Sequence, residues 1–504
     1  MNSSSVCHEI PDCPRLFVDA FRGAYLQKTR NPDNVFILSH WHGDHYGSLP
    51  RDGKYQGPSL IHCTPTTAAL LREIHQVPEK YVVEHGYGET WLFHPLGNTK
   101  GLSTVQITFY DANHCPGAAI IVVEMADGKV HLHTGDMRYH TMMNVYPILE
   151  RAASSRAIDT VLLDTTYSDP KHNFQPQEAA IDAIAAYSEG LLGTSRKCSS
   201  NVLILLSCYS IGKEKVLWEV SSRTNQLVYV NDRKMRMMRC IQKHHESSSQ
   251  IVQRCTTDPN ATDIHVIPMG LAGELWPYFQ PNYWACAEYA KALETEYTKV
   301  VAFIPTGWAD GSKWNKKNAT SKFDCKGIEV EIRLISYSEH SSFSELKTFV
   351  EFLRPRKVVP TVFKDDRDRV KIEGRFAIDS GRAKQSFFST MTSKSSNTGK
   401  QVLPGAATRL DPFPKRPKLN MSRSSPLKQK EGHVEKLASM RLMGFSADAA
   451  NGALVESKGN IEEAVGLLIT GKTKLPPTAE VIDLSGTNDV VESKSVPATP
   501  CEKQ

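Results

Sequence analysis

Residues 36–45 read Phe36-Ile37-Leu38-Ser39-His40-Trp41-His42-Gly43-Asp44-His45, an apolar run that ends in four metal-ligand side chains. The segment 35–38 predicts a buried strand, and the residues after it predict the tight loop at its C-terminal end. His40 and His42 lie two residues apart, so a bent loop can direct both imidazoles at one ion. Asp44 and His45 follow at once and point to a second position beside it. Imidazoles with a carboxylate are ligands for zinc, iron or manganese, and hydrolysis is the usual chemistry of such sites.

Three further candidate ligands each follow a segment that alternates apolar and polar residues as a strand does. His114 follows the segment 105–109, Asp136 follows 130–132, and His340 follows 330–334. The end of a rigid strand holds a side chain to the precision that a metal site needs. We predict one metal position with the ligands His40, His42, His114 and Asp136, and a second with Asp44, His45, His340 and a bridging Asp136. His131 and His133 alternate with apolar residues on their strand and are interpreted as structural.

These motifs resemble those of the metallo-β-lactamase superfamily. Asp19 matches its first motif, the His-x-His-x-Asp-His segment the second, His114 the third and Asp136 the fourth. Further segments narrow the resemblance to the β-CASP nucleases of DNA cross-link repair, the group of Apollo and Artemis. These segments are 111–118, 164–167, 209–214, 305–308 and 337–342.

Within that group the resemblance implies that Asp164 is motif A and His340 is motif B. Val362 stands at the position of motif C, where valine is typical of DNA-directed members and histidine of RNA-directed members. The resemblance therefore favours DNA as the substrate.

The resemblance covers roughly residues 12–365 and implies an α/β fold, a metallo-β-lactamase αββα sandwich with an inserted β-CASP α/β domain. We expect the first part of the sandwich at 1–165, the insertion at 166–328 and the return of the sandwich at 329–365. Apolar strand-like runs within 166–328, with helix-like stretches between them, favour an α/β insertion. A helix is expected after Ser342 as N-cap, and the strand 357–363 closes the folded body.

Composition bounds the class of protein. The 504 residues suggest two or three domains, and 40% hydrophobic residues are enough for a sizeable core. The net charge is only +5, so any track for nucleic-acid phosphates has to be local. The eleven cysteines form no Cys-x-x-Cys pair, which argues against a zinc finger or a disulfide framework and predicts reduced thiols inside the cell. The first residues do not resemble a signal peptide, and no apolar run approaches membrane-spanning length, so no membrane contact is expected.

Residues 366–430 are rich in Lys, Arg, Ser, Thr and Pro and predict a disordered linker. Within it, Lys415, Arg416 and Lys418 form a basic cluster typical of a nuclear import signal, with a merely solvated basic patch as the alternative. This cluster predicts a nuclear protein.

Residues 431–472 predict three short amphipathic helices and resemble the ubiquitin-associated (UBA) domain. The resemblance implies ubiquitin contacts at Met443, Gly444, Phe445 and Leu468, and a purely structural three-helix bundle is the alternative. The tail 473–504 contains Val481, Ile482 and Leu484 around one acid, which resembles a SUMO-interacting motif that adds a strand to its partner.

Together these features predict a metal-dependent DNA nuclease, a 5′-to-3′ exonuclease on 5′-phosphorylated ends in interstrand cross-link or double-strand-break repair. One or two Zn²⁺ ions are expected, with Mg²⁺ or Mn²⁺ as alternatives at the second position, to activate water and clamp the phosphate. Asp44 would orient the nucleophile, and the predicted catalytic set is completed by His45, Asp136, Asp164 and His340. The protein is expected to be a monomer recruited through ubiquitin and SUMO.

Ser210 and Lys213 precede a predicted helix, whose first backbone amides can hold a phosphate. We interpret these two residues as candidates for the pocket that receives the substrate phosphate. Three functions remain as alternatives: an Artemis-like endonuclease, an RNA-processing β-CASP nuclease, and an inactive scaffold that reads ubiquitin and SUMO.

Overall fold

The computed structural model describes residues 8–94, 104–155, 157–193, 201–244, 250–274, 279–307, 309, 320–377 and 447–457. The chain forms two compact units, Met1–Ser422 and Arg423–Gln504. Among the helices within these described ranges, none has the length and apolar character to cross a membrane.

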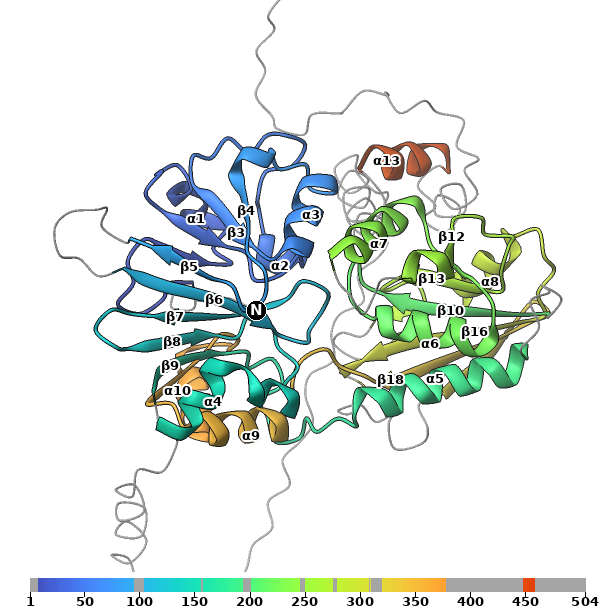
Figure 1. Ribbon diagram of the computed structural model, residues 1–504. Helices are drawn as coiled ribbons and strands as arrows, with labels where there is room; N and C mark the ends of the chain where they lie inside the picture. Colours follow the sequence, from blue (N-terminus) through green and yellow to red (C-terminus); the bar gives the residue numbers. More distant parts are fainter. Residues whose placement is uncertain are drawn as a thin grey trace, which may run out of the picture. The chain divides into compact units, whose positions relative to one another are not determined.

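The part of the larger unit outside the inserted region contains two sheets (Figure 1). The smaller sheet is parallel and consists of β1 (Leu16–Val18), β2 (Val35–Ile37), β3 (Leu60–Cys63) and β4 (Val82–Glu84). The larger sheet has the order β19-β9-β8-β7-β6-β5. Its strands are β5 (Thr90–Phe93), β6 (Val105–Asp111), β7 (Ala119–Glu124), β8 (Val130–His133), β9 (Ile158–Leu163) and β19 (Lys357–Pro360).

The strand β7 shows why the two sheets pack together. Its side chains are apolar on both faces, which is the pattern of a strand covered on both sides. Ile121 and Val123 lie in the core with Leu16 and Ile37 of the smaller sheet, whereas Ile120 faces the other way. The outer faces are covered by α1 (Gly23–Lys28), α2 (Gly43–Tyr46) and α3 (Pro65–Glu73), and by α4 (Pro147–Ser155) and α9 (Phe343–Leu353). This layering is consistent with the expected αββα sandwich.

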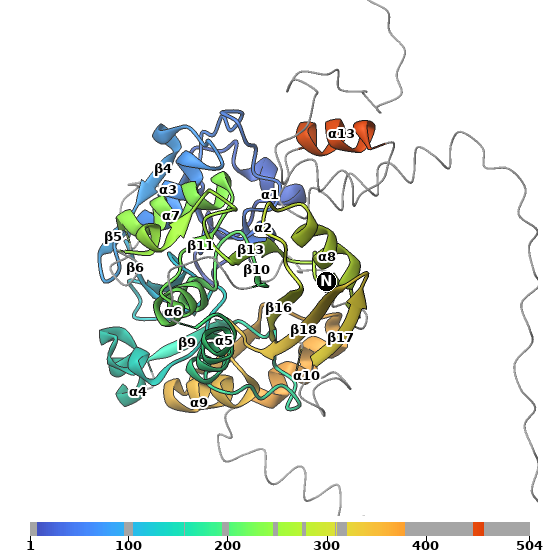
Figure 2. The same ribbon diagram turned by 90° about the vertical axis from the view of Figure 1, so that its right-hand side faces the viewer.

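The inserted region is built on a seven-stranded sheet, parallel except for one edge strand. In spatial order its strands are β12 (Cys255–Thr256), β11 (Val228–Tyr229), β13 (Ile264–Pro268), β10 (Val202–Cys208), β16 (Lys299–Thr306), β18 (Ile328–Ser336) and β17 (Thr320–Cys325). Its helices are α5 (Gln177–Leu192), α6 (Glu214–Thr224), α7 (Asp232–His244) and α8 (Tyr283–Lys291), and Figure 2 shows α5 and α6 side by side. The remaining short elements are β14 (Gly273–Glu274), β15 (Gln280–Pro281) and the 3₁₀ turns η2 (Glu79–Tyr81), η3 (Thr141–Val145) and η5 (Ile251–Arg254).

Two expected boundaries are wrong. The strand β18 pairs with β16 and β17, so the chain leaves the insertion after Ser336 and not at residue 329. Alternation of apolar and polar residues predicts a strand, but it does not say which sheet the strand joins. The predicted linker also begins too early, because α10 (Asp366–Phe376) is a helix with a side-chain cap from Asp365. Its two buried side chains, Ile372 and Phe376, stand four residues apart among charged residues that masked the pattern.

In the second unit, α13 (Ala447–Glu456) matches one of the three helices expected at 431–472. Ala450, Ala453 and Leu454 are buried on it. The other predicted partner-binding residues lie outside the described residues: Met443, Gly444, Phe445 and Leu468 for ubiquitin, Val481, Ile482 and Leu484 for SUMO, and Lys415, Arg416 and Lys418 for import.

Candidate metal centre

One carboxylate oxygen stands at the centre of the predicted ligands. Asp136 Oδ2 lies 3.1 Å from His45 Nε2 and 3.6 Å from His40 Nε2. The same oxygen lies 3.6 Å from His114 Nε2 and 4.0 Å from His340 Nε2. The structure therefore brings together side chains that are as far apart in the sequence as residues 40 and 340.

Most of these side chains come from the loop after a strand, and His45 lies on the short helix α2. His40 and His42 follow β2, His114 lies between β6 and β7, and Asp136 follows β8. His340 lies between β18 and α9, whose first turn is fixed by a capping box of Ser342 and Glu345. The rigid strands thus direct side chains from four loops at one point.

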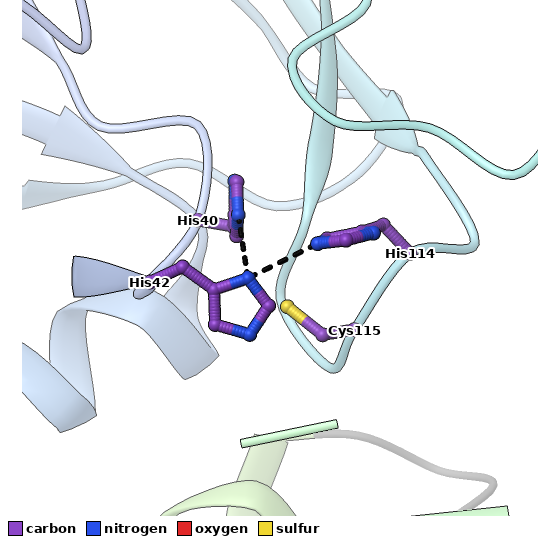
Figure 3. A group of neighbouring side chains, drawn as sticks. All are labelled: His40, His42, His114 and Cys115. Carbon is purple, nitrogen blue, oxygen red and sulfur yellow. Dashed lines mark hydrogen bonds between the residues drawn. The ribbon is translucent and has the colours of Figure 1, made fainter. Parts of the chain in front are cut away.

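The ligand atoms form three overlapping groups among the described residues. In the first, His42 Nδ1 lies 2.9 Å from His40 Nε2 and 3.1 Å from His114 Nε2 (Figure 3). The second joins His45 and Asp136 to His40, and the third joins His340 and Asp136 to His114. These clusters of imidazole and carboxylate fit a divalent metal site, because one nitrogen or oxygen of each residue lies close to those of the others in its group.

The outer nitrogen of each imidazole is held by the protein, which leaves the inner nitrogen for a metal. His40 Nδ1 lies 2.9 Å from Ser39 Oγ, and His42 Nε2 lies 3.0 Å from the carbonyl oxygen of Ile211. His45 Nδ1 lies 2.7 Å from Asp19 Oδ2, and His114 Nδ1 lies 2.8 Å from the carbonyl oxygen of Glu339. His340 Nδ1 lies 2.8 Å from Asp164 Oδ2. Such outer contacts fix the tautomer and the orientation of metal-binding histidines.

The environment also sets the protonation of these groups. Burial, with other imidazoles nearby, holds the pKa values of His40 and His114 well below the ordinary histidine value, so both rings are neutral. Neutral imidazole is the form that binds a metal. Burial opposes the charged form of His340 as well, but Asp164 and Asp136 outweigh it and raise its pKa to about 9. The pKa of Asp136 is lowered, because nearby imidazoles outweigh the effect of its burial.

Asp44 differs from the other predicted ligands. Its side chain is 74% exposed, and its Oδ2 lies 3.9 Å from His45 Nε2. Among the described residues, the groups close enough to share an ion do not include it. Asp44 therefore stands at the rim of the centre, where it can reach a water molecule or a substrate.

Cys115 is a neighbour that the sequence analysis did not single out. Its sulfur lies close to His40, His42 and His114 (Figure 3). Burial and nearby carboxylates raise the pKa of this thiol well above its ordinary value, which keeps it protonated and a poor metal ligand. Only its place directly after His114 could have indicated it.

A cavity of about 270 Å³ opens beside the centre, between the sandwich and the insertion. The sandwich lines it with His42, Asp44 and Asp136, and the insertion lines it with Ser210 and Lys213. Lys213 Nζ donates a hydrogen bond to the carbonyl oxygen of Pro305 at 2.8 Å, so part of its donor capacity is already used. Val362 lies next to this region, because its N–H donates to Thr165 Oγ1, beside Asp164.

Comparisons with known proteins agree with the motifs. Residues 249–366 match the family described as DNA repair metallo-beta-lactamase. The chain is 31% identical to the DNA cross-link repair protein SNM1 of Arabidopsis thaliana over 356 residues, which are 70% of this chain and 65% of that protein. It is 33% identical to DNA ligase 6 of the same plant over 368 residues, 71% of this chain and 24% of the relative.

A third relative is the 5′ exonuclease Apollo of Gallus gallus, 29% identical over 335 residues, 65% of this chain and 58% of that protein. The chain thus spans less than two thirds of the length of these three relatives. The matches support the family of metallo-β-lactamase DNA repair nucleases, in agreement with the resemblance read from the motifs.

Proposed function

Taking the similarity to the DNA repair metallo-β-lactamases as the premise, we propose that this chain is a metal-dependent nuclease that removes nucleotides from 5′-phosphorylated DNA ends. The observation that carries the proposal is the centre around Asp136 Oδ2, which has four imidazole nitrogens within 4.0 Å and opens into a cavity. Such a set of groups is suited to the hydrolysis of a phosphodiester.

A divalent cation, Zn²⁺ with Mg²⁺ or Mn²⁺ as alternatives at a second position, supplies a bound water of lowered pKa and offsets the charge of the phosphate. His40, His42, His114 and Asp136 would hold one ion, and His45, His340 and the same Asp136 a second. Asp164 orients His340, because Asp164 Oδ2 lies 2.8 Å from His340 Nδ1.

We assign to Asp44 the role of positioning the water molecule that attacks the phosphate. Its exposed carboxylate lies on the cavity wall and is free to orient the attacking water and accept its proton. Asp19 contacts His45 Nδ1 and so orients the ring of His45 next to Asp136.

The 5′-phosphate would be received between the two domains. Ser210 and Lys213 line the cavity on the insertion side. Lys213 Nζ already donates to the carbonyl oxygen of Pro305 at 2.8 Å and lies 3.6 Å from Met269 Sδ, so a contact with the phosphate would replace one of these. The valine at position 362 supports DNA over RNA as the substrate.

Recruitment belongs to the rest of the chain. We propose that residues 431–472 bind ubiquitin, that the segment 481–484 binds SUMO, and that the basic cluster at 415–418 directs import into the nucleus. The support is the pattern of the sequence, together with the helix α13 at the expected place in the first of these segments.

The test uses the purified chain and two variants, Asp44→Ala and Asp33→Ala. Asp33 is a matched control, because its carboxylate is also exposed and belongs to the same domain, where it pairs with Arg15. Each protein is incubated with 3′-labelled single-stranded DNA that carries a 5′-phosphate or a 5′-hydroxyl, and with matching RNA. We expect a ladder of shortened products from 5′-phosphorylated DNA, unchanged in Asp33→Ala and reduced by about 10²- to 10⁴-fold in Asp44→Ala.

Other outcomes point to the alternatives. Internal cuts would indicate an Artemis-like endonuclease, and a preference for RNA would indicate an RNA-processing enzyme. A wild-type chain that binds metal but cleaves nothing would overturn the proposal in favour of a ubiquitin- and SUMO-binding scaffold.

A further inference from the structure

An exposed aromatic ring stands in the wall of the metal cavity. Tyr209 follows β10, lines the cavity beside His42 and Asp44, and is 50% exposed. Its ring centroid lies 6.2 Å from that of His42. Among the described residues it is the one exposed large apolar side chain that lines this cavity. The groups around it suit a phosphate, whereas an open aromatic face suits a flat apolar partner.

The ring is supported from behind. Lys213 Nζ lies over it at 4.3 Å from the centroid, which occupies one face through a cation–π contact. The opposite face is not occupied by that contact, and half of the side chain is exposed.

The backbone that carries the ring is also fixed. Lys234 of α7 donates from Nζ to the carbonyl oxygens of Tyr209 at 3.3 Å and Ser210 at 3.0 Å. The next carbonyl, that of Ile211, lies 3.0 Å from His42 Nε2. The loop therefore connects the insertion directly to a predicted metal ligand.

Lys234 is in turn held by a buried ion pair. Its Nζ lies 2.9 Å from Glu214 Oε1, and both side chains are almost wholly buried. Glu214 also accepts hydrogen bonds from the backbone N–H of Gly212, at 3.0 Å. These contacts fix the backbone that carries the ring, and the contact with Lys213 holds the ring itself, so the platform is ordered before any substrate arrives, which lowers the entropy cost of binding.

We propose that Tyr209 is a stacking platform for one unpaired nucleobase of the substrate strand, beside the phosphate that is cut. The proposal rests on the proposed nuclease function and names the part of the substrate that the insertion reads. Every base has a flat π face, so such a platform tolerates any sequence but requires the base to be unpaired. It selects single-stranded or frayed ends over closed duplex.

The experiment removes the base from one position at a time. 5′-Phosphorylated single strands carry a tetrahydrofuran abasic unit at the first, second or third nucleotide, and kcat/KM is measured for each. The proteins are wild type, Tyr209→Phe, which keeps the ring, and Tyr209→Leu, which keeps apolar volume without it. Trp284→Ala is the matched control, because Trp284 is also an exposed ring with a lysine over it, Lys326, but does not line the cavity.

For wild type we expect one abasic position to lower kcat/KM by about 5- to 150-fold, the range for loss of one base–aromatic stack. Tyr209→Leu should show the same loss of kcat/KM already on intact DNA, and an abasic unit at that position should lower its kcat/KM no further. Tyr209→Phe and Trp284→Ala should behave as wild type on every substrate. Zinc content and thermal unfolding verify that each variant is folded.

If wild type and Tyr209→Leu lose activity in the same ratio at every abasic position, the ring contacts no base and the platform is refuted, although the nuclease function stands. If wild type cleaves no DNA, the proposed function fails, and the platform fails with it.

Discussion

Replacing Asp19 by asparagine should weaken metal binding although Asp19 is not a predicted ligand. Both of its carboxylate oxygens accept hydrogen bonds: Oδ1 from Ser39 N at 2.8 Å, and Oδ2 from Ser39 Oγ at 2.7 Å. Oδ2 also lies 2.7 Å from His45 Nδ1. Ser39 Oγ in turn lies 2.9 Å from His40 Nδ1, so Asp19 also orients the ring of His40 through Ser39. One carboxylate thus orients two of the inward-facing imidazoles.

An asparagine has one accepting oxygen where Asp19 has two. If its NH₂ faces His45, the ring must accept at Nδ1 and carry its proton on Nε2, which is then unable to bind a metal. If its NH₂ faces Ser39 N–H instead, two donors oppose each other in a buried place. A buried polar group left unsatisfied costs about 1–3 kcal/mol. Outer contacts of this kind commonly contribute 10–100-fold to metal affinity, so we expect Asp19→Asn to weaken zinc binding by roughly that factor.

The assay is a zinc titration of the metal-free chain in competition with a chromophoric chelator. Asp12→Asn is the matched control, because Asp12 shares the left-handed backbone of Asp19, with φ of 58° against 51°. Its carboxylate, however, forms an exposed pair with Lys129. Any effect of asparagine on the backbone is therefore common to both variants. An Asp19→Asn protein that is folded and binds zinc as tightly as Asp12→Asn would show that Asp19 does not orient the ligands.

Three further predictions concern stability and metal. Lys234→Met removes the ion-pair partner of the buried Glu214 and should destabilise the insertion by about 3–5 kcal/mol, measured as a lower thermal midpoint. Adding Glu214→Gln to this variant should recover part of the lost stability. Burial lowers the pKa of His62 to about 3 and that of His85 to about 4. Because the unfolded chain takes up these protons below about pH 6.5 while the folded chain stays neutral, the contribution of these two histidines to stability is full above that pH and falls toward pH 4. Urea unfolding of wild type should therefore lose more stability over this range than urea unfolding of His62→Phe. A chelator should abolish cleavage and lower the thermal midpoint, and added Zn²⁺ should restore both, because a ligand that binds only the native state stabilises that state. A thermal midpoint that the chelator does not change would contradict a metal in this centre.

Most of the candidate ligands were accessible from the sequence because they stand where an apolar strand ends. The run that leads to His40 is one case, and the alternating strand before Asp136 is another. The helix after Ser342 was equally accessible, because its capping box and its apolar spacing are local signals. Local pattern decides strand ends and helix starts, and these positions carry the chemistry.

The remaining features depend on contacts between distant segments. The hydrogen-bond partner of His42 is the backbone carbonyl of Ile211, and a carbonyl has no signature in a sequence. The membership of β18 in the sheet of the insertion is decided by its neighbours β16 and β17, not by its own alternation. The open ring of Tyr209 likewise follows from the fold around it, because tyrosine is as common in cores as on surfaces.

The pairing of β9 with β19 has a consequence for how the protein is made on the ribosome. β9 ends at Leu163 and β19 begins at Lys357, so the whole insertion is translated between two neighbouring strands. Until β19 emerges, β9 is an uncovered sheet edge, which nascent chains must shield from aggregation. His340 emerges equally late, long after His40 and Asp136. A nascent chain therefore lacks one of the clustered imidazoles until the insertion has been synthesised, and under the proposed function it would gain activity only when its folding is nearly finished.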